Sequence, residues 1–84
     1  MDITTIQSDI KKFIESSILD NAVKIDNQTV LQDAGMDSFS IVEIILFIER
    51  KYGVGVPNDK LLPENFASIE AIAATVQELL TEPK

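Results

Sequence analysis

The 84-residue sequence contains no cysteine, no histidine and no tryptophan. Without cysteine the chain has neither a disulfide framework nor a thiol nucleophile, and without histidine it lacks the commonest general base. The usual zinc ligand sets are excluded as well, because they draw on these two residue types. The chain therefore carries little equipment for catalysis of its own.

Long apolar runs and basic residues are scarce too. The longest apolar run covers residues 44–48, far short of the roughly 18–20 residues of a membrane span. The opening MDITTIQSD lacks the basic and apolar regions of a signal peptide. Fourteen acidic against seven basic residues give a net charge of −7, which repels nucleic acid and anionic membranes and favours basic protein surfaces. We expect a cytoplasmic protein that binds other proteins.

What the chain does contain is ordinary globular composition, with 45% hydrophobic and 25% charged residues, enough for a single domain over residues 1–84. Apolar residues at helical spacing predict a first helix over about 3–17 and a last helix over about 69–80. Residues 81–84 are expected to fray. The two apolar stripes consist of Ile3, Ile6, Ile10, Phe13, Ile14 and Ile18 in the first helix, and Ile69, Ile72, Ala73, Val76, Leu79 and Leu80 in the last.

The middle of the chain is divided by residues that start and stop helices. Asp37 precedes an uninterrupted helix-compatible stretch and Gly53 follows it, which predicts a second helix over about 38–52. Pro63 and Glu64 fit the first turn of a helix and predict a short helix over about 63–66. Turn-forming residues fill 18–37, which we expect to be a long loop. The predicted fold class is all-α: a small bundle of three main helices plus one short helix.

The second helix is unusual because seven of the eight residues in 41–48 are apolar. Such a helix is buried on more than one side or exposes a sticky face. Ile41 and Ile45 lie four apart on one face, and we predict that they meet partner molecules. Val42 and Leu46 form the parallel stripe and are predicted to belong to the core. A second interpretation is that all seven residues are core packing.

The sequence GMDSF at residues 35–39 is the candidate functional motif. Ser38 would stand where a helix presents unpaired N–H groups and a partial positive charge, which stabilises a phosphate ester. Asp37 could accept hydrogen bonds from first-turn amides and leave the Ser38 hydroxyl free. On spacing alone, an ordinary helix cap is the favoured explanation of the pair, because capping residues are frequent at helix starts.

The wider pattern resembles the acyl carrier protein family, whose attachment motif usually reads Asp-Ser-Leu. The resemblance covers nearly the whole chain in the expected order. Beyond GMDSF it is carried by Asp33-Ala34-Gly35, Val42-Glu43, Phe47-Ile48-Glu49, Tyr52-Gly53-Val54, Val56-Pro57 and the stretch from Pro63 to Ile69.

This resemblance implies a covalent carrier instead of an enzyme. Ser38 would receive phosphopantetheine from coenzyme A through a separate phosphopantetheinyl transferase that needs magnesium. The thiol of the arm would hold an acyl group as a thioester and present it to ligases and synthases of fatty-acid, polyketide or other specialised acyl metabolism. The borrowed thiol would compensate for the missing cysteine. For such a shuttle we expect a monomer.

The resemblance also implies a docking surface on the second helix. Glu43 and Glu49 match acidic positions at which carrier proteins meet basic residues of their enzymes, and Asp37 lies beside the arm. Phe39 replaces the usual leucine and is predicted either to fill a partner's pocket or to cover the loop. The alternative for the three acids is a plain solvated helix face.

One departure from the family pattern bears on the pathway. Glu43, Glu49, Arg50 and Lys51 are the only charged residues of 38–54, so this segment has no net charge. The acidic helix of a housekeeping fatty-acid carrier is missing, which favours a specialised stand-alone member. Aminoacyl or peptidyl carriers, including the D-alanyl type, stay open as an alternative, as does a non-covalent helical adaptor.

Overall fold

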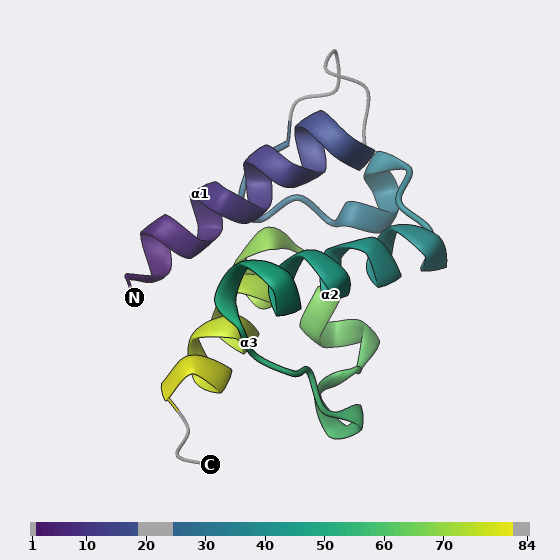
Figure 1. Cartoon of the computed structure of the whole chain (residues 1–84). Helices are drawn as coiled ribbons and strands as arrows, with labels where there is room; N and C mark the ends of the chain where they lie inside the picture. Colours follow the sequence, from purple (N-terminus) through teal and green to yellow (C-terminus); the bar gives the residue numbers. More distant parts are fainter. Residues whose placement is uncertain (1, 19–24, 82–84) are drawn as a thin grey trace.

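The structure, a computed structural model, describes residues 2–18 and 25–81, and within them the regular elements are all helical. This confirms the all-α prediction. The main elements are α1 (Ile3–Phe13), α2 (Ser38–Tyr52) and α3 (Ile69–Thr81), drawn in Figure 1. Shorter turns are η1 (Ile14–Ile18), η2 (Leu31–Ala34), η3 (Asn58–Lys60) and η4 (Pro63–Phe66). In the described ranges, no helix is both long and apolar enough to cross a membrane.

Helix α1 begins at a side-chain cap and ends in a wider turn. Asp2 is the N-cap, and its carboxylate accepts a hydrogen bond from the backbone N–H of Thr4 at 3.2 Å. The α-helical pattern stops at Phe13 and continues as a π-helix over Ile14–Ile18. The Ser16 hydroxyl donates to the carbonyl oxygen of Lys12 at 2.6 Å, and such bonds back to the preceding turn compete with the helical ladder.

Helices α2 and α3 start and stop at residues suited to these positions. Gly53 ends α2 with φ of +68°, a left-handed conformation that glycine adopts without strain, and its N–H donates to the Glu49 carbonyl oxygen. At the start of α3 the Ser68 hydroxyl oxygen accepts the N–H of Ala71 at 3.1 Å.

The sequence predicts a long loop over residues 18–37, and the described part of this segment contains a short helical turn, η2. Residues 19–24 of that loop lie outside the described residues, as do residues 82–84 of the predicted frayed tail. A turn at Asp26 is followed by η2, where the Leu31 N–H donates to the carbonyl oxygen of Ala67 at 2.8 Å. The N–H of Glu70 donates to the Asn27 carbonyl oxygen at 2.9 Å. These two backbone hydrogen bonds fasten the loop to the start of α3.

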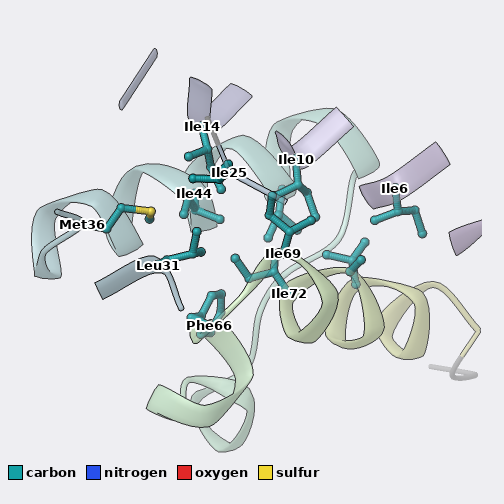
Figure 2. Close-up of a cluster of buried hydrophobic side chains, with 13 residues drawn as sticks. Ile6, Ile10, Ile14, Ile25, Leu31, Met36, Ile44, Phe66, Ile69 and Ile72 are labelled. Atoms are coloured by element: carbon teal, nitrogen blue, oxygen red, sulfur yellow. The ribbon is translucent and has the colours of Figure 1, made fainter. Parts of the chain in front are cut away.

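The core lies between the three helices and includes residues from the connecting segments (Figure 2). Helix α1 packs against α3, and α2 contributes Ile44 and Ile48, both fully buried. The other buried apolar residues are Ile6, Ile10, Ile14, Ile25, Leu31, Met36, Phe66, Ile69, Ile72, Ala73 and Val76.

The prediction that Val42 and Leu46 belong to the core is wrong. Their exposed fractions are 53% and 48%, whereas Ile44 and Ile48 are buried. A helix turns by about 100° per residue, so the side of α2 that carries Ile44 and Ile48 faces the core and Val42 and Leu46 project away from it. The sequence of α2 does not reveal this orientation, because the helix carries apolar residues on both sides.

An aromatic cluster joins α1 to α2 at the far end of α2 from Ser38. The rings of Phe13 and Phe47 stack with centroids 4.3 Å apart, and Tyr52 meets Phe47 edge-on at 6.5 Å. The Tyr52 hydroxyl donates to the carboxylate of Asp9 at 3.0 Å, and Lys51 Nζ lies 3.9 Å from the same carboxylate. Burial and the Asp9 carboxylate raise the pKa of Tyr52 well above its ordinary value.

Candidate functional site

The start of α2 is built by a short sequence of turn and cap residues. Gly35 ends η2 with φ of +100°, which reverses the chain, and the N–H of Met36 donates to the Leu31 carbonyl oxygen at 3.2 Å. The Met36 side chain is buried and anchors the junction in the core (Figure 2). Asp37 is extended and caps the helix. Ser38 is the first residue of α2.

Asp37 is held in its charged form by the helix it caps. Its Oδ1 atom accepts the N–H of Ser40 at 3.0 Å and the Ser40 hydroxyl at 3.2 Å. The hydrogen bond from the Ser40 N–H lowers the pKa of Asp37 below its ordinary value. The cap therefore satisfies a first-turn amide with a side chain other than Ser38. A negatively charged phosphodiester at the helix start would also be favoured by the helix dipole.

A groove of about 780 Å³ opens beside this junction, within the size range of small-molecule sites. Buried Leu31, Met36 and Phe66 line it, and it reaches Asp37 at the start of α2. Its remaining lining residues come from η2, α2 and the segment that leads through η4, namely Val30, Gln32, Ile41, Ile45, Leu61, Leu62, Pro63, Glu64 and Ala67. The lining is mainly apolar, so the groove suits a hydrocarbon chain better than a charged ligand.

The predicted partner residues of α2 do not share one environment. Phe39 is 80% exposed, so it does not cover the loop, and its predicted contact with a partner stays a prediction. Glu43 is exposed as well. Ile41 and Ile45, in contrast, are partly buried, pack against the core and line the groove. Their predicted contact with partners stays a prediction.

Glu49 has a structural contact that the sequence did not indicate. Its carboxylate accepts the backbone N–H of Val56 at 3.0 Å and is partly buried. This hydrogen bond closes the loop after Gly53 back onto α2. Docking at Glu49 also stays a prediction, and any partner there would compete with this contact.

The groove is also lined by three exposed apolar residues that the sequence does not single out, namely Val30, Leu61 and Leu62. None of them belongs to a helical stripe, so periodicity could not mark them. The available signal was local: two adjacent leucines stand directly before Pro63, in an otherwise mostly polar stretch over residues 57–65. Asn65 Nδ2 donates to the Lys60 carbonyl oxygen at 2.8 Å and holds this segment in place.

Comparison with known proteins identifies the family. The profile of the family described as "Phosphopantetheine attachment site" matches residues 10–76, which span the whole junction and the groove. The chain belongs to the acyl carrier protein family. Members of this family are carriers and not catalysts, and their prosthetic group is a covalently attached phosphopantetheine.

The chain is similar both to acyl carrier proteins and to aminoacyl carrier proteins. An acyl carrier protein of Campylobacter hominis is 32% identical over 63 residues, covering 75% of this chain and 76% of that protein. Aminoacyl carrier protein 1 of Bradyrhizobium diazoefficiens is 29% identical over 79 residues, covering 92% and 88%. A chain in the crystal structure of Bradyrhizobium japonicum glycine:[carrier protein] ligase complexed with glycylated carrier protein is 26% identical, with a TM-score of 0.69 and coverage of 87% and 96%.

The junction and the groove fit the prosthetic group of this family. The arm brings a phosphodiester, which suits the start of α2, and a chain that ends in a thiol, which the protein itself lacks. When bound, the group supplies the thiol on which a carboxylic acid is held as a thioester. The chain's own residues supply the attachment point, the cap and the adjoining apolar surface.

Proposed function

We propose that this carrier holds acyl groups as thioesters on a phosphopantetheine arm attached to Ser38, and that it presents them to enzymes of fatty-acid, polyketide or other specialised acyl metabolism. The observation that carries this proposal is the apolar groove, which opens at Asp37, the residue next to Ser38. An arm fixed there can place the first part of its cargo against Ile41 and Ile45.

Attachment would be a phosphoryl-type transfer by a separate phosphopantetheinyl transferase. The Ser38 oxygen forms a bond to the phosphorus of the pantetheine phosphate, and the pyrophosphate bond of coenzyme A breaks. Adenosine bisphosphate leaves and the hydroxyl proton passes to the transferase. Asp37 supports this step by occupying the Ser40 amide itself.

The partners that fit this function are the transferase and an acyl-activating ligase or synthase. A tethered intermediate is delivered to each docked enzyme at high effective concentration. Support for a ligase comes from the crystal structure in which the similar carrier chain is bound to a glycine:[carrier protein] ligase. The same resemblance supports a second candidate function, an aminoacyl carrier, since the bound carrier in that structure is glycylated.

The two cargo classes predict different behaviour of the loaded protein. The protein should be loaded by a transferase with octanoyl-coenzyme A or glycyl-coenzyme A, and the melting temperature of each form measured. Burial of a methylene group contributes about 0.8 kcal/mol, so two buried methylenes of the octanoyl chain raise the melting temperature by roughly 6–13 °C in a domain of this size. A glycyl group has no hydrocarbon chain to bury.

A matched pair of variants tests whether the groove is responsible. Ile45→Ala removes a groove residue, and Leu46→Ala removes its exposed neighbour on the same helix. We expect Ile45→Ala to reduce the difference between the octanoyl and glycyl forms, and Leu46→Ala to preserve it. Equal melting temperatures of the two loaded wild-type forms would contradict acyl storage in the groove and favour the aminoacyl function.

A further inference from the structure

One side of α2 is apolar and open to solvent. Phe39, Val42 and Leu46 have exposed fractions of 80%, 53% and 48%. At about 100° per residue these three side chains and the exposed Glu43 and Arg50 fall within an arc of about 100°, opposite Ile44 and Ile48. We call these five residues the outer face of α2.

The two charges on the outer face have opposite signs and a fixed order. Glu43 and Arg50 are seven residues apart, so that they lie about 10 Å from each other along the helix axis. This distance is too long for them to neutralise each other directly. Among the described residues the ion pairs are Lys51 with Asp9 and Lys60 with Glu78, and neither includes Arg50.

Lys51 differs from Arg50 although the two are adjacent. Lys51 points toward α1 and is paired with Asp9. Arg50 lies on the outer face, one turn beyond Leu46. A positive charge at position 50 or at position 51 interacts favourably with the helix dipole at the last turn. The dipole therefore does not explain why an arginine stands at position 50, on the apolar side of the helix.

We propose that Arg50 is a specificity-determining contact of this carrier, and that the phosphopantetheinyl transferase of its own organism, which would act at Ser38, presents a carboxylate to it. The proposal rests on the proposed function, since that function requires enzymes to reach the start of α2. The matching partner surface has an apolar depression for Phe39 and Leu46, a basic group opposite Glu43 and an acidic group about 10 Å further on. A uniformly basic partner surface would be repelled at Arg50.

Binding to the transferase tests this proposal separately from attachment. All binding variants carry Ser38→Ala, so that no arm is transferred, and their dissociation constants for the purified transferase of the same organism are measured. Arg50→Gln is compared with Lys51→Gln, which removes the same charge from the neighbouring position. A third variant combines Glu43→Arg with Arg50→Glu, which leaves the net charge at −7 and reverses the order of the charges. Circular dichroism checks that each variant is folded.

We expect Arg50→Gln to weaken binding about threefold to fivefold, as for an exposed ion pair, and Lys51→Gln to leave it within about twofold. The exchanged variant should bind roughly tenfold more weakly or worse, since both charges then meet like charges. Added salt should reduce these differences. Equal effects of Arg50→Gln and Lys51→Gln, an exchanged variant with wild-type affinity, or no binding at all would overturn the proposal.

The mass of the unmutated protein after incubation with coenzyme A and the transferase is a separate readout. Absence of a mass gain would refute attachment at Ser38, and the binding constants would still decide the role of Arg50. A normal mass gain with no effect of Arg50→Gln on binding would refute the role of Arg50 alone.

Discussion

The orientation of α2 decides which residues can meet partners, and a pair of alanine substitutions tests it. Ile44 is completely buried between the helices, whereas Leu46, two residues later, is 48% exposed. Both are large aliphatic residues in the interior of the same helix. Replacing each by alanine removes a similar volume, so the difference between the two variants reports on burial.

The expected magnitudes follow from these exposures. Truncation of a fully buried isoleucine to alanine costs about 2–5 kcal/mol, and the better helix propensity of alanine returns only a few tenths of a kcal/mol. We therefore expect Ile44→Ala to lose about 3 kcal/mol of about 4–13 kcal/mol available to an 84-residue domain. Leu46→Ala should lose less than about 1 kcal/mol, because most of its apolar surface is not withdrawn from water.

Urea denaturation followed by circular dichroism measures both variants, and thermal unfolding provides a second value. A loss of about 3 kcal/mol lowers the melting temperature by roughly 12–24 °C in a domain of this size. A larger loss at Leu46 would show that the helix is turned the other way, and equal losses would show that Leu46 is as buried as Ile44. The outer face of α2 would then be core, and the proposal for Arg50 would fail with it.

Three other contacts make separate predictions. Glu49→Ala should speed amide hydrogen exchange at Val56 and cost about 1 kcal/mol, whereas Glu49→Gln keeps an acceptor and should be milder. Because the pKa of Tyr52 is raised in the folded protein, the contribution of Tyr52 to stability is complete below its ordinary pKa of 10.0 and is lost as the pH rises above it. Absorbance titration of this sole tyrosine should therefore show a phenol that resists ionisation until the protein unfolds. Tyr52→Phe should remove this alkaline dependence of stability. The pKa of Asp37 is lowered in the folded protein, so the contribution of Asp37 to stability is present above its ordinary pKa of 3.8 and is lost as the pH falls below it. Acid unfolding of Asp37→Asn should lack this component. Identical acid transitions of Asp37→Asn and the wild type would count against the cap.

The sequence predicts those parts of the fold that local chemistry determines. Asp37 begins α2 and Gly53 ends it whatever surrounds them. Helices α1 and α3 each have one clearly apolar side, which marks the side that faces the core. The orientation of α2 could not be predicted in this way, since Val42 and Ile44 are chemically alike and only the neighbouring helices decide which is buried. The π-helical turn after Phe13 likewise leaves no mark in the apolar periodicity, which continues through Ile14 and Ile18.

The candidate site also contains parts that the sequence predicts and parts that it does not. The motif around Ser38 is visible in the sequence because the family pattern preserves its order along the chain. The groove is not, because it forms where η2, α2 and the leucines before Pro63 come together from separate parts of the chain. The bond from Val56 to Glu49 is also tertiary, which is why an acid predicted for docking has a structural contact as well.

The proposals for this carrier all depend on covalent attachment of phosphopantetheine at Ser38, and intact-mass spectrometry detects that attachment. The protein is incubated with coenzyme A, magnesium and a phosphopantetheinyl transferase, alongside Ser38→Ala and a control, Ser40→Ala, which removes the other hydroxyl of the first turn. We expect a gain of one phosphopantetheinyl group on the wild type and on Ser40→Ala, and none on Ser38→Ala. An unmodified wild type, or a gain that persists in Ser38→Ala, would contradict attachment at Ser38.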